Sequence, residues 1–264
     1  MKAKDMFEHF ISRADWLERD KTVDGIIAGD PEKEVERCLV AWMPSVEAIR
    51  TAAERGFDMV LCHEATFWDH TNDTPEGKPH AADKLAFINE TGIVILRNHD
   101  AWDRWPKIGI PWAWAKFLGV DGDPVATDNY MHRYDIAPVA FGEFAENFAK
   151  RTAEIGEPVV EVVGDPNQTV SKIGIGTGCG CSIMSYIGLG CDCSIVCDDG
   201  QSYWRNIQYA ADRNHPVICV NHATSEEPGM MTLAQYVNDN IEGVAAEHLP
   251  QGCRFRPVGK MPQD

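Results

Sequence analysis

Histidines that follow apolar segments, each with an acidic neighbour, are the residues of this chain best suited to chemistry. The segments DMVLC, IVILR and PVICV each lead within two residues to a histidine. The six candidate side chains are His63, Glu64, His99, Asp103, His222 and Glu226. Imidazole and carboxylate groups together suit zinc, iron, manganese or nickel. The repeated pattern therefore predicts a metal site.

In two of these places a carboxylate follows the histidine at a spacing of four residues. If the backbone turns helical there, His99–Asp103 and His222–Glu226 each face one way, because residues i and i+4 are neighbours on a helix. A single histidine after a strand is more often a hydrogen-bonded loop residue, and each carboxylate would also suit a helix N-terminus. Repetition at three strand ends favours the metal interpretation. The other histidines, His70 among them, show no such placement and are expected at the surface or in the core.

The number of donors predicts how many ions are bound. A catalytic zinc takes about three protein ligands and keeps one position open, so six donors suit two ions roughly 3.5–4 Å apart. Three carboxylates offset most of the charge of two divalent cations and leave a net positive site that acidifies bound water. That water would be the nucleophile, and no protein side chain is assigned as catalytic. Glu64 would be a proton shuttle if it is not a ligand.

Alternating strands and helices must position these residues. Strands are expected at RCLVAWM, DMVLC and IVILR, with helices at 44–56 and 81–92 between them. Short apolar strands separated by helices are typical of a parallel sheet covered on both faces, which binds ligands at the carboxyl ends of its strands. The pattern resumes with KIGIGTG, CSIVC and PVICV. We therefore predict an α/β fold of two similar lobes, with mainly parallel sheets flanked by helices and the metal site at strand ends between the lobes.

The boundaries of the lobes are predicted from a change in composition. Residues 1–122 form the N-terminal α/β lobe with the first ligands. Residues 123–169 are richer in Gly, Pro and Asp and are expected to be a short connector with one helix. Residues 170–264 form the C-terminal α/β lobe with the remaining ligands.

Composition and charge limit the partners. The net charge of −17 argues against nucleic acid or an anionic membrane as a partner. No apolar run approaches the roughly 18 residues that span a bilayer, and the first residues lack the apolar core of a signal peptide. We therefore expect a cytoplasmic protein that acts on a small molecule.

The cysteines suggest a second kind of metal site, one with sulfur ligands. CGC and CDCSIVC contain Cys179, Cys181, Cys191, Cys193 and Cys197, which suggest zinc or an iron–sulfur cluster. Structural zinc sites usually show C-x(2–4)-C pairs, whereas the spacing here is C-x-C. Free cysteine is among the most buried residue types, so we expect small buried residues in strands and turns. The glycines of GIGTGCG lack a phosphate-binding pattern and are expected to form a close turn.

Several segments together resemble the Nif-three-like family, also called GTP cyclohydrolase I type 2-like. VDGIIAG, FDMVLCHEATFW, ILRNHDAWD and VNHATSEEPG resemble its motifs, and GIGTGCG and CDCSIVCDDGQSYW resemble its glycine turn and the strand that follows. The resemblance implies that the six residues above bind two divalent ions (Zn, Mn or Fe), with Glu226 as the bridge. It also implies a homohexamer, a ring built from dimers. Glu64 stands where the family has a histidine, which would shift the preference towards manganese or iron.

Tryptophans accompany the same motifs. Trp68, Trp102 and Trp204 are predicted to contact a flat, ring-shaped substrate, although core packing or a subunit interface would also account for tryptophan. Trp204 stands where the family commonly has a histidine. We therefore predict a dinuclear-metal hydrolase that acts on a C–N bond of a small cyclic substrate, with cyclohydrolase- or amidohydrolase-like chemistry. The alternatives are a non-catalytic metal-binding or metal-delivery protein, and a toroidal scaffold stabilised by metal.

Overall fold

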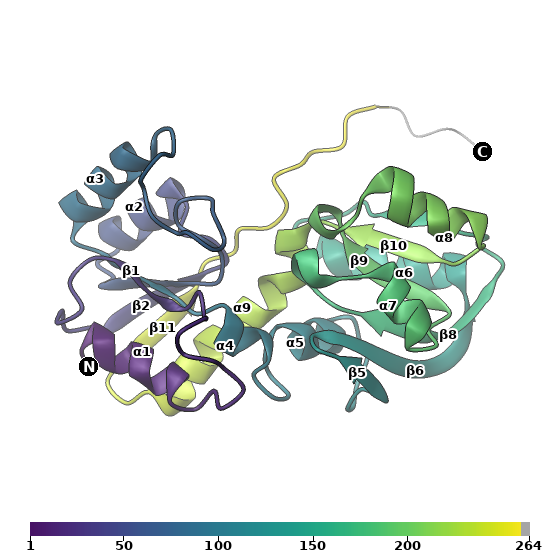
Figure 1. Ribbon diagram of the computed structural model, residues 1–264, viewed down its shortest axis with the longest axis horizontal. Helices are drawn as coiled ribbons and strands as arrows, with labels where there is room; N and C mark the ends of the chain where they lie inside the picture. Colours follow the sequence, from purple (N-terminus) through teal and green to yellow (C-terminus); the bar gives the residue numbers. More distant parts are fainter. Residues whose placement is uncertain (260–264) are drawn as a thin grey trace. The chain divides into compact units, whose positions relative to one another are not determined.

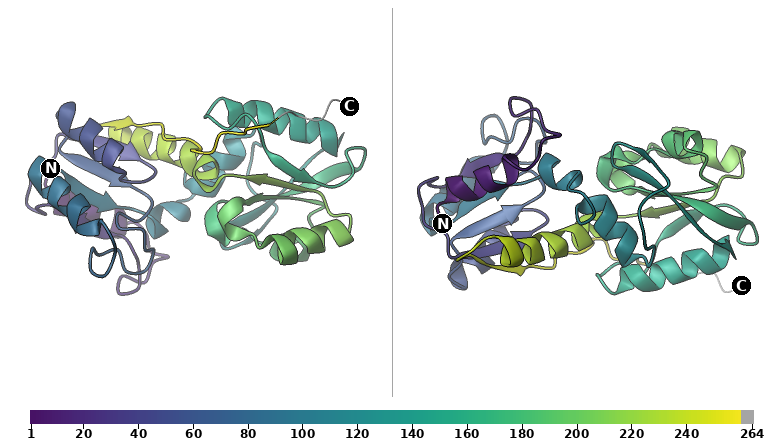
Figure 2. Two further views of the ribbon diagram at one scale, coloured as in Figure 1. Left: turned by 90° about the horizontal axis from the view of Figure 1, so that it is seen from above. Right: turned by 90° about the horizontal axis from the view of Figure 1, so that it is seen from below.

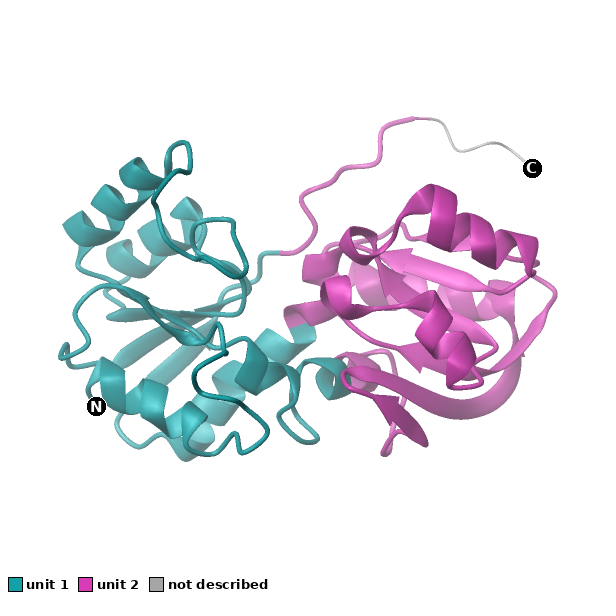
Figure 3. Ribbon diagram, viewed as in Figure 1, with its two compact units in different colours: residues 1–113, 228–251 teal, residues 114–227, 252–264 magenta. Residues whose placement is uncertain are grey.

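The computed structural model describes residues 1–259, which divide into two compact units (Figure 3). Unit 1 contains Met1–Ala113 and Pro228–Gln251, and unit 2 contains Trp114–Glu227 and residues 252–259. Each unit has its own β-sheet flanked by helices (Figure 1). The predicted α/β class with two such lobes is confirmed.

Within the described residues, unit 1 contains a five-stranded sheet in the order β1-β4-β3-β2-β11. The strands are β1 (Gly25–Ala28), β2 (Arg37–Ala41), β3 (Met59–Cys62), β4 (Val94–Arg97) and β11 (Ala245–His248). β1 runs antiparallel to β4, and the other pairs are parallel. The unit also contains the helices α1 (Ala3–Ile11), α2 (Val46–Glu54), α3 (Ala81–Thr91) and α4 (Asp100–Asp103).

Helices cover both faces of this sheet. Side chains of α1 and of the long helix α9 (His222–Asn240) share one buried apolar cluster with β2, β3 and β4, and side chains of α2 and α3 share another with the same strands. The Ser45 side chain caps α2 by accepting a hydrogen bond from the Ala48 N–H, as expected at a helix N-terminus. Cys62 pairs with Arg97 in register, so the residues after β3 and β4 leave the sheet at the same edge.

Unit 2 has a six-stranded sheet, within the part of the chain described, in the order β5-β6-β8-β9-β10-β7. Its strands are β5 (Ala126–Asp128), β6 (Met131–Ala140), β7 (Glu161–Val163), β8 (Thr169–Ile175), β9 (Cys193–Cys197) and β10 (Val217–Val220). The central β8, β9 and β10 are parallel, whereas β5, β6 and β7 join by antiparallel pairing. The prediction of mainly parallel sheets therefore holds for unit 1 but is wrong for unit 2, whose sheet is mixed with its parallel part in the middle.

Helices also flank the second sheet. α6 (Phe141–Ala153) covers one face, and α7 (Ile183–Gly188) and α8 (Gln208–Asp212) cover the other (Figure 2). Short turns follow the parallel strands: the 3-10 helix η1 (Gly178–Gly180) after β8, and the 3-10 helix η2 (Asp198–Gly200) and the π-helix η3 (Tyr203–Ile207) after β9.

The predicted lobe boundaries need correction. Residues 123–169 are not a connector, because they supply β5, β6, α6 and β7 to unit 2. The predicted C-terminal lobe is also divided, since 228–251 belong to unit 1, where β11 pairs with β2. The chain passes between the units within α5 (Ile110–Phe117) and within α9. No helix in the described part of the chain is long and apolar enough to cross a membrane.

Candidate metal centre

Four of the six predicted ligands gather in unit 1, just beyond β3 and β4. His63 Nε2 lies 3.5 Å from Asp103 Oδ1, and His99 Nδ1 lies 3.3 Å from Asp103 Oδ2. The rings of His63 and His99 stack with their centroids 4.2 Å apart, and His99 Nε2 lies 4.0 Å from Glu64 Oε1. With bonds of about 2.1 Å, two ligands of one tetrahedral ion lie about 3.4 Å apart. The 3.5 Å between His63 Nε2 and Asp103 Oδ1 is therefore suited to two ligands of one ion.

Backbone hydrogen bonds fix the residues after β3. The N–H groups of His63 and Glu64 both donate to the Trp42 carbonyl, at 3.0 and 2.8 Å. The Arg97 Nε donates to the His63 carbonyl at 3.1 Å. These bonds tie the two residues after the strand to Trp42 and Arg97, so that the backbone of His63 and Glu64 is held in place.

The carboxylate of Asp24 positions His99. It accepts hydrogen bonds from the backbone N–H groups of His99 at 2.5 Å and of Asp100 and Ala101 at 2.9 Å each. These are N–H groups that the start of α4 leaves without helical partners. Burial raises the pKa of Asp24, although the same N–H groups oppose the rise. Asp24 belongs to the segment VDGIIAG, and its role was not predicted.

Asp100, which was not predicted, sets the charge and orientation of His99. Its Oδ1 lies 3.0 Å from His99 Nδ1, and its Oδ2 accepts a bond of 2.9 Å from the Thr22 hydroxyl. Burial alone would lower the pKa of His99, but the carboxylates of Asp103, Asp100 and Glu64 raise it to about 9. Metal ligation would displace this proton. With Nδ1–H donated to Asp100, Nε2 is the nitrogen that could bind an ion, the common arrangement around metal-binding histidines.

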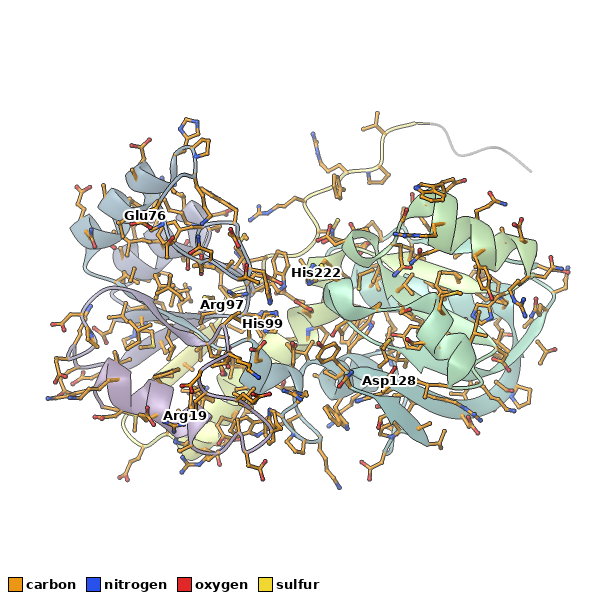
Figure 4. All side chains as sticks on the ribbon, in the orientation of Figure 1. Arg19, Glu76, Arg97, His99, Asp128 and His222 are labelled. Carbon is orange, nitrogen blue, oxygen red and sulfur yellow. The ribbon has the colours of Figure 1, made fainter. Side chains whose placement is uncertain are left out.

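A buried arginine joins the site to His70. Arg97, labelled in Figure 4, is fully buried at the end of β4. It donates to the His70 carbonyl at 2.8 Å and to His70 Nδ1 at 3.0 Å. Its Nη2 also lies 3.9 Å from Glu64 Oε2. The His70 ring stands edge-on to that of His99, with the centroids 4.6 Å apart. Because a guanidinium only donates, His70 Nδ1 must accept and its proton is on Nε2. His70 is exposed, as predicted for a surface residue, but it also lies beside the candidate ligands Glu64 and His99.

The other two predicted ligands form a pair in unit 2. His222, labelled in Figure 4, is the first residue of α9. Its Nε2 lies 3.1 Å from Glu226 Oε1 one turn later. Asp199 Oδ2 lies 3.0 Å from His222 Nδ1, and the His222 N–H donates to Asp198 Oδ1 at 2.9 Å. Burial opposes protonation of His222, but Glu226 and its other neighbours raise its pKa well above the ordinary value. The helical backbone predicted for the pair is thus observed.

A glycine allows this pair to sit against the turn η1. Gly178 has φ +59°, and a Cβ there would lie 2.6 Å from Glu226 Oε1 and 2.7 Å from His222 Nε2. GIGTGCG therefore forms the close turn after a strand that was predicted. The absent side chain makes room for the two candidate ligands.

The predicted substrate-binding tryptophans differ in exposure. Trp102 is fully buried in the core of unit 1, and its indole N–H donates to the Gly229 carbonyl at 2.8 Å. The prediction that Trp102 stacks on a substrate is therefore corrected, because neither face of its ring is accessible. Trp68 and Trp204 are 55% and 74% exposed. Their contact with a substrate stays a prediction.

Other proteins resemble this chain in sequence or in fold. The GTP cyclohydrolase 1 type 2 homolog of Clostridium perfringens (strain 13 / Type A) is 22% identical over 228 residues, which cover 83% of this chain and 84% of that protein. Among solved structures, the protein ybgI is 19% identical with a TM-score of 0.78, over 94% of this chain and 98% of that chain. The Staphylococcus aureus hypothetical protein SA1388 is 16% identical with a TM-score of 0.77, over 98% and 99%. These structures share the fold.

The family itself is given by a model that spans nearly the whole chain. Residues 1–250 match the model described as Duf34/NIF3 (NGG1p interacting factor 3). The match includes both units and all six candidate ligands. The chain belongs to the Duf34/NIF3 family.

Proposed function

We propose that the protein is a hydrolase that binds two divalent metal ions and cleaves a C–N bond of a small cyclic substrate. The observation that carries the proposal is the convergence of His63, His99 and Asp103, whose donor atoms lie within 4.8 Å of one another. The His222–Glu226 pair supplies a second set of donors. The name of the Clostridium perfringens relative, a cyclohydrolase homolog, supports a cyclic substrate.

The charges in unit 1 fit a bound cation. The carboxylates of Asp24, Glu64, Asp100 and Asp103 surround His99, whereas the guanidinium of Arg97 lies 3.9 Å from one of them, Glu64. A buried surplus of negative charge is costly unless it is neutralised. Without metal, protonation of His99 supplies part of the compensation, which is why its pKa lies at about 9. Divalent ions at this position would supply the rest.

Each side chain has a distinct task in the proposed reaction. When bound, the ions would polarise a carbonyl or imine of the substrate and lower the pKa of water. Asp100 and Asp199 hold the Nδ1 sides of His99 and His222, so that the two rings keep their orientation. Glu64, held between Arg97 and His99, is placed to accept a proton if it is not itself a ligand. His70 presents an Nε2–H that can donate a hydrogen bond.

Metal analysis tests the binding half of the proposal. Full-length protein prepared without chelator should contain close to two divalent ions per chain by mass spectrometry. Asp103→Asn and Glu226→Gln should each lower that number, because each removes a charged donor. Asp128→Asn, on an exposed residue of β5, is the matched control and should not change it. A reproducible value of one or less in the unaltered protein would contradict the two-ion proposal.

A substrate screen tests the catalytic half. The metal-loaded protein should hydrolyse at least one compound among cyclic amides, imides, purines and pterins, GTP included, with product detected by mass spectrometry. Asp103→Asn should abolish the turnover and Asp128→Asn should keep it. Ready metal exchange without turnover of any compound would instead favour a metal-delivery protein.

The sequence resemblance also implies a homohexameric ring of dimers. We propose this assembly for the protein in solution. Light scattering at micromolar protein concentration measures the mass directly, and a monomer would contradict the proposal.

A further inference from the structure

A cysteine, a carboxylate and the second ring nitrogen of His222 meet in unit 2, on the side of the ring that faces away from Glu226. Cys179 Sγ lies 3.9 Å from His222 Nδ1, and Asp199 Oδ2 lies 3.0 Å from the same nitrogen. Donor atoms of the three residues all lie within 4.8 Å of one another. A sulfur and a nitrogen bound to one tetrahedral zinc lie about 3.6 Å apart, given bonds of about 2.3 and 2.05 Å. The three donors thus have nearly the spacing of a mononuclear metal site.

The two cysteines of the CGC motif have different surroundings. Cys181 is buried, with its Sγ 3.9 Å from Cys197 Sγ, as expected for a cysteine that packs in the core. Cys179 is exposed on the turn η1 and faces the histidine. The prediction of small buried residues therefore fits Cys181, Cys191, Cys193 and Cys197 but fails for Cys179. The position of Cys179 requires another explanation than packing.

Tautomerism allows the neutral ring of His222 to bind an ion through Nδ1 or through Nε2, but not through both at once. A neutral imidazole has one N–H and one lone pair. With the proton on Nδ1, the ring donates to Asp199 and Nε2 can bind an ion beside Glu226. With an ion on Nδ1, the proton lies on Nε2 and is donated to Glu226 Oε1, 3.1 Å away. A carboxylate is thus in place to accept the ring proton in either state.

The ligands beside His222 Nδ1, which include the Cys179 thiolate, are softer than the Glu226 carboxylate beside His222 Nε2. Thiolate sulfur favours thiophilic ions such as zinc, whereas imidazole with carboxylates alone also accepts manganese and iron. We propose that Cys179, Asp199 and His222 Nδ1 bind one thiophilic divalent ion, zinc, as an alternative to metal binding through His222 Nε2. Binding releases the thiol proton of Cys179 to solvent, and the ring of His222 exchanges its Nδ1 proton for one on Nε2, so that it stays neutral. This site does not depend on the proposed hydrolase activity.

Cadmium is a suitable probe, because a cadmium–thiolate bond gives a charge-transfer absorption in the ultraviolet. The full-length protein, freed of metal by chelator, is titrated with Cd²⁺. We expect a band that saturates at one thiolate per chain, is lost in Cys179→Ser and is unchanged in Cys253→Ser, the control for a partly exposed thiol. A band that persists in Cys179→Ser, or no band in the unaltered protein, would overturn the proposal. Since Cys179 is exposed, serine there should leave the circular dichroism spectrum unchanged.

Two further variants separate this site from the one proposed for hydrolysis. His222→Gln should weaken Cd²⁺ binding by about tenfold or more, since it removes the nitrogen ligand. Unchanged affinity would show simple binding to a surface thiol and would also overturn the proposal. Glu226→Gln should lower the content of the ions proposed for catalysis but keep the cadmium band, because the glutamine amide oxygen still accepts the Nε2–H. Loss of the band in Glu226→Gln would contradict the two-sided role of His222.

Discussion

Replacing Gly178 by alanine tests whether His222 and Glu226 are metal ligands. A Cβ at this position would lie 2.6 Å from Glu226 Oε1 and 2.7 Å from His222 Nε2, and real Cβ atoms essentially never approach closer than 3.0 Å. The two donor atoms must therefore move by at least about 0.4 and 0.3 Å, more than the tolerance of about 0.2 Å in metal–ligand distances. We expect metal affinity to fall about tenfold or more. The left-handed backbone should also cost about 1–2 kcal/mol of stability.

A second glycine separates these two effects. Gly92 ends α3 in unit 1 with φ +66°, close to the +59° of Gly178, and a Cβ there would meet no atom within 4 Å. Gly92→Ala should therefore lose about 1–2 kcal/mol in urea denaturation of the metal-free protein but bind metal normally in calorimetric titration. Wild-type metal affinity in Gly178→Ala would refute the reasoning. Equal loss of affinity in both variants would refute it as well, since backbone strain rather than ligand displacement would then be the cause.

Three other perturbations have defined outcomes. Arg97→Lys should lower the free energy of unfolding in urea by roughly 2–4 kcal/mol. A single ammonium group cannot donate to the His63 carbonyl, the His70 carbonyl and His70 Nδ1 in the geometry of the guanidinium. The raised pKa of His99 should stabilise the metal-free protein by about 3 kcal/mol below pH 6.5, and this stabilisation should be lost as the pH rises through about 9. His99→Asn should lack the effect. If the unfolding free energies of the unaltered protein and of His99→Asn differ by the same amount at every pH, the prediction is contradicted. Glu64→His should keep two ions by metal analysis but shift the preference towards zinc, and loss of both ions would show that Glu64 is indispensable.

The elements around the unit 1 site could be predicted because their patterns are local. β3 and β4 are short apolar runs, and Ser45 and Gly92 mark a helix start and a helix end. The strands missed by the prediction depend on partners far along the chain. β11, with the sequence AAEH, lacks an apolar run and is a strand because β2 offers it an edge for pairing. β6 contains Arg, Asp and Pro residues, and its burial decreases along its length, as in a strand that lies partly at the surface.

The candidate ligands could be predicted from spacing, but the groups that orient them could not. Asp24 reaches His99 from 75 positions away, and Asp199 reaches His222 from 23 positions away. No periodicity or motif joins such pairs, because only the folded chain brings them together. The rule of polar residues at strand ends does apply to Asp198 and Asp199, which directly follow β9, and it would have identified both. His70 follows no strand, so only its contact with the buried Arg97 reveals it.

The same arrangement around a histidine occurs independently in each unit. In both His99 and His222, the ring Nδ1 lies 3.0 Å from a carboxylate, that of Asp100 or Asp199. In both, the backbone N–H donates to another carboxylate, that of Asp24 or Asp198, and an acidic residue follows four positions later on a helical turn. A histidine placed only for packing would not require two carboxylates, one for its ring and one for its backbone. Such a pair of contacts fixes the tautomer and the direction of the ring, which is the requirement for a metal ligand that acts through Nε2. Asp100→Asn and Asp199→Asn should therefore each lower the metal affinity measured by calorimetric titration, and the loss of binding free energy should exceed the loss of unfolding free energy measured in urea.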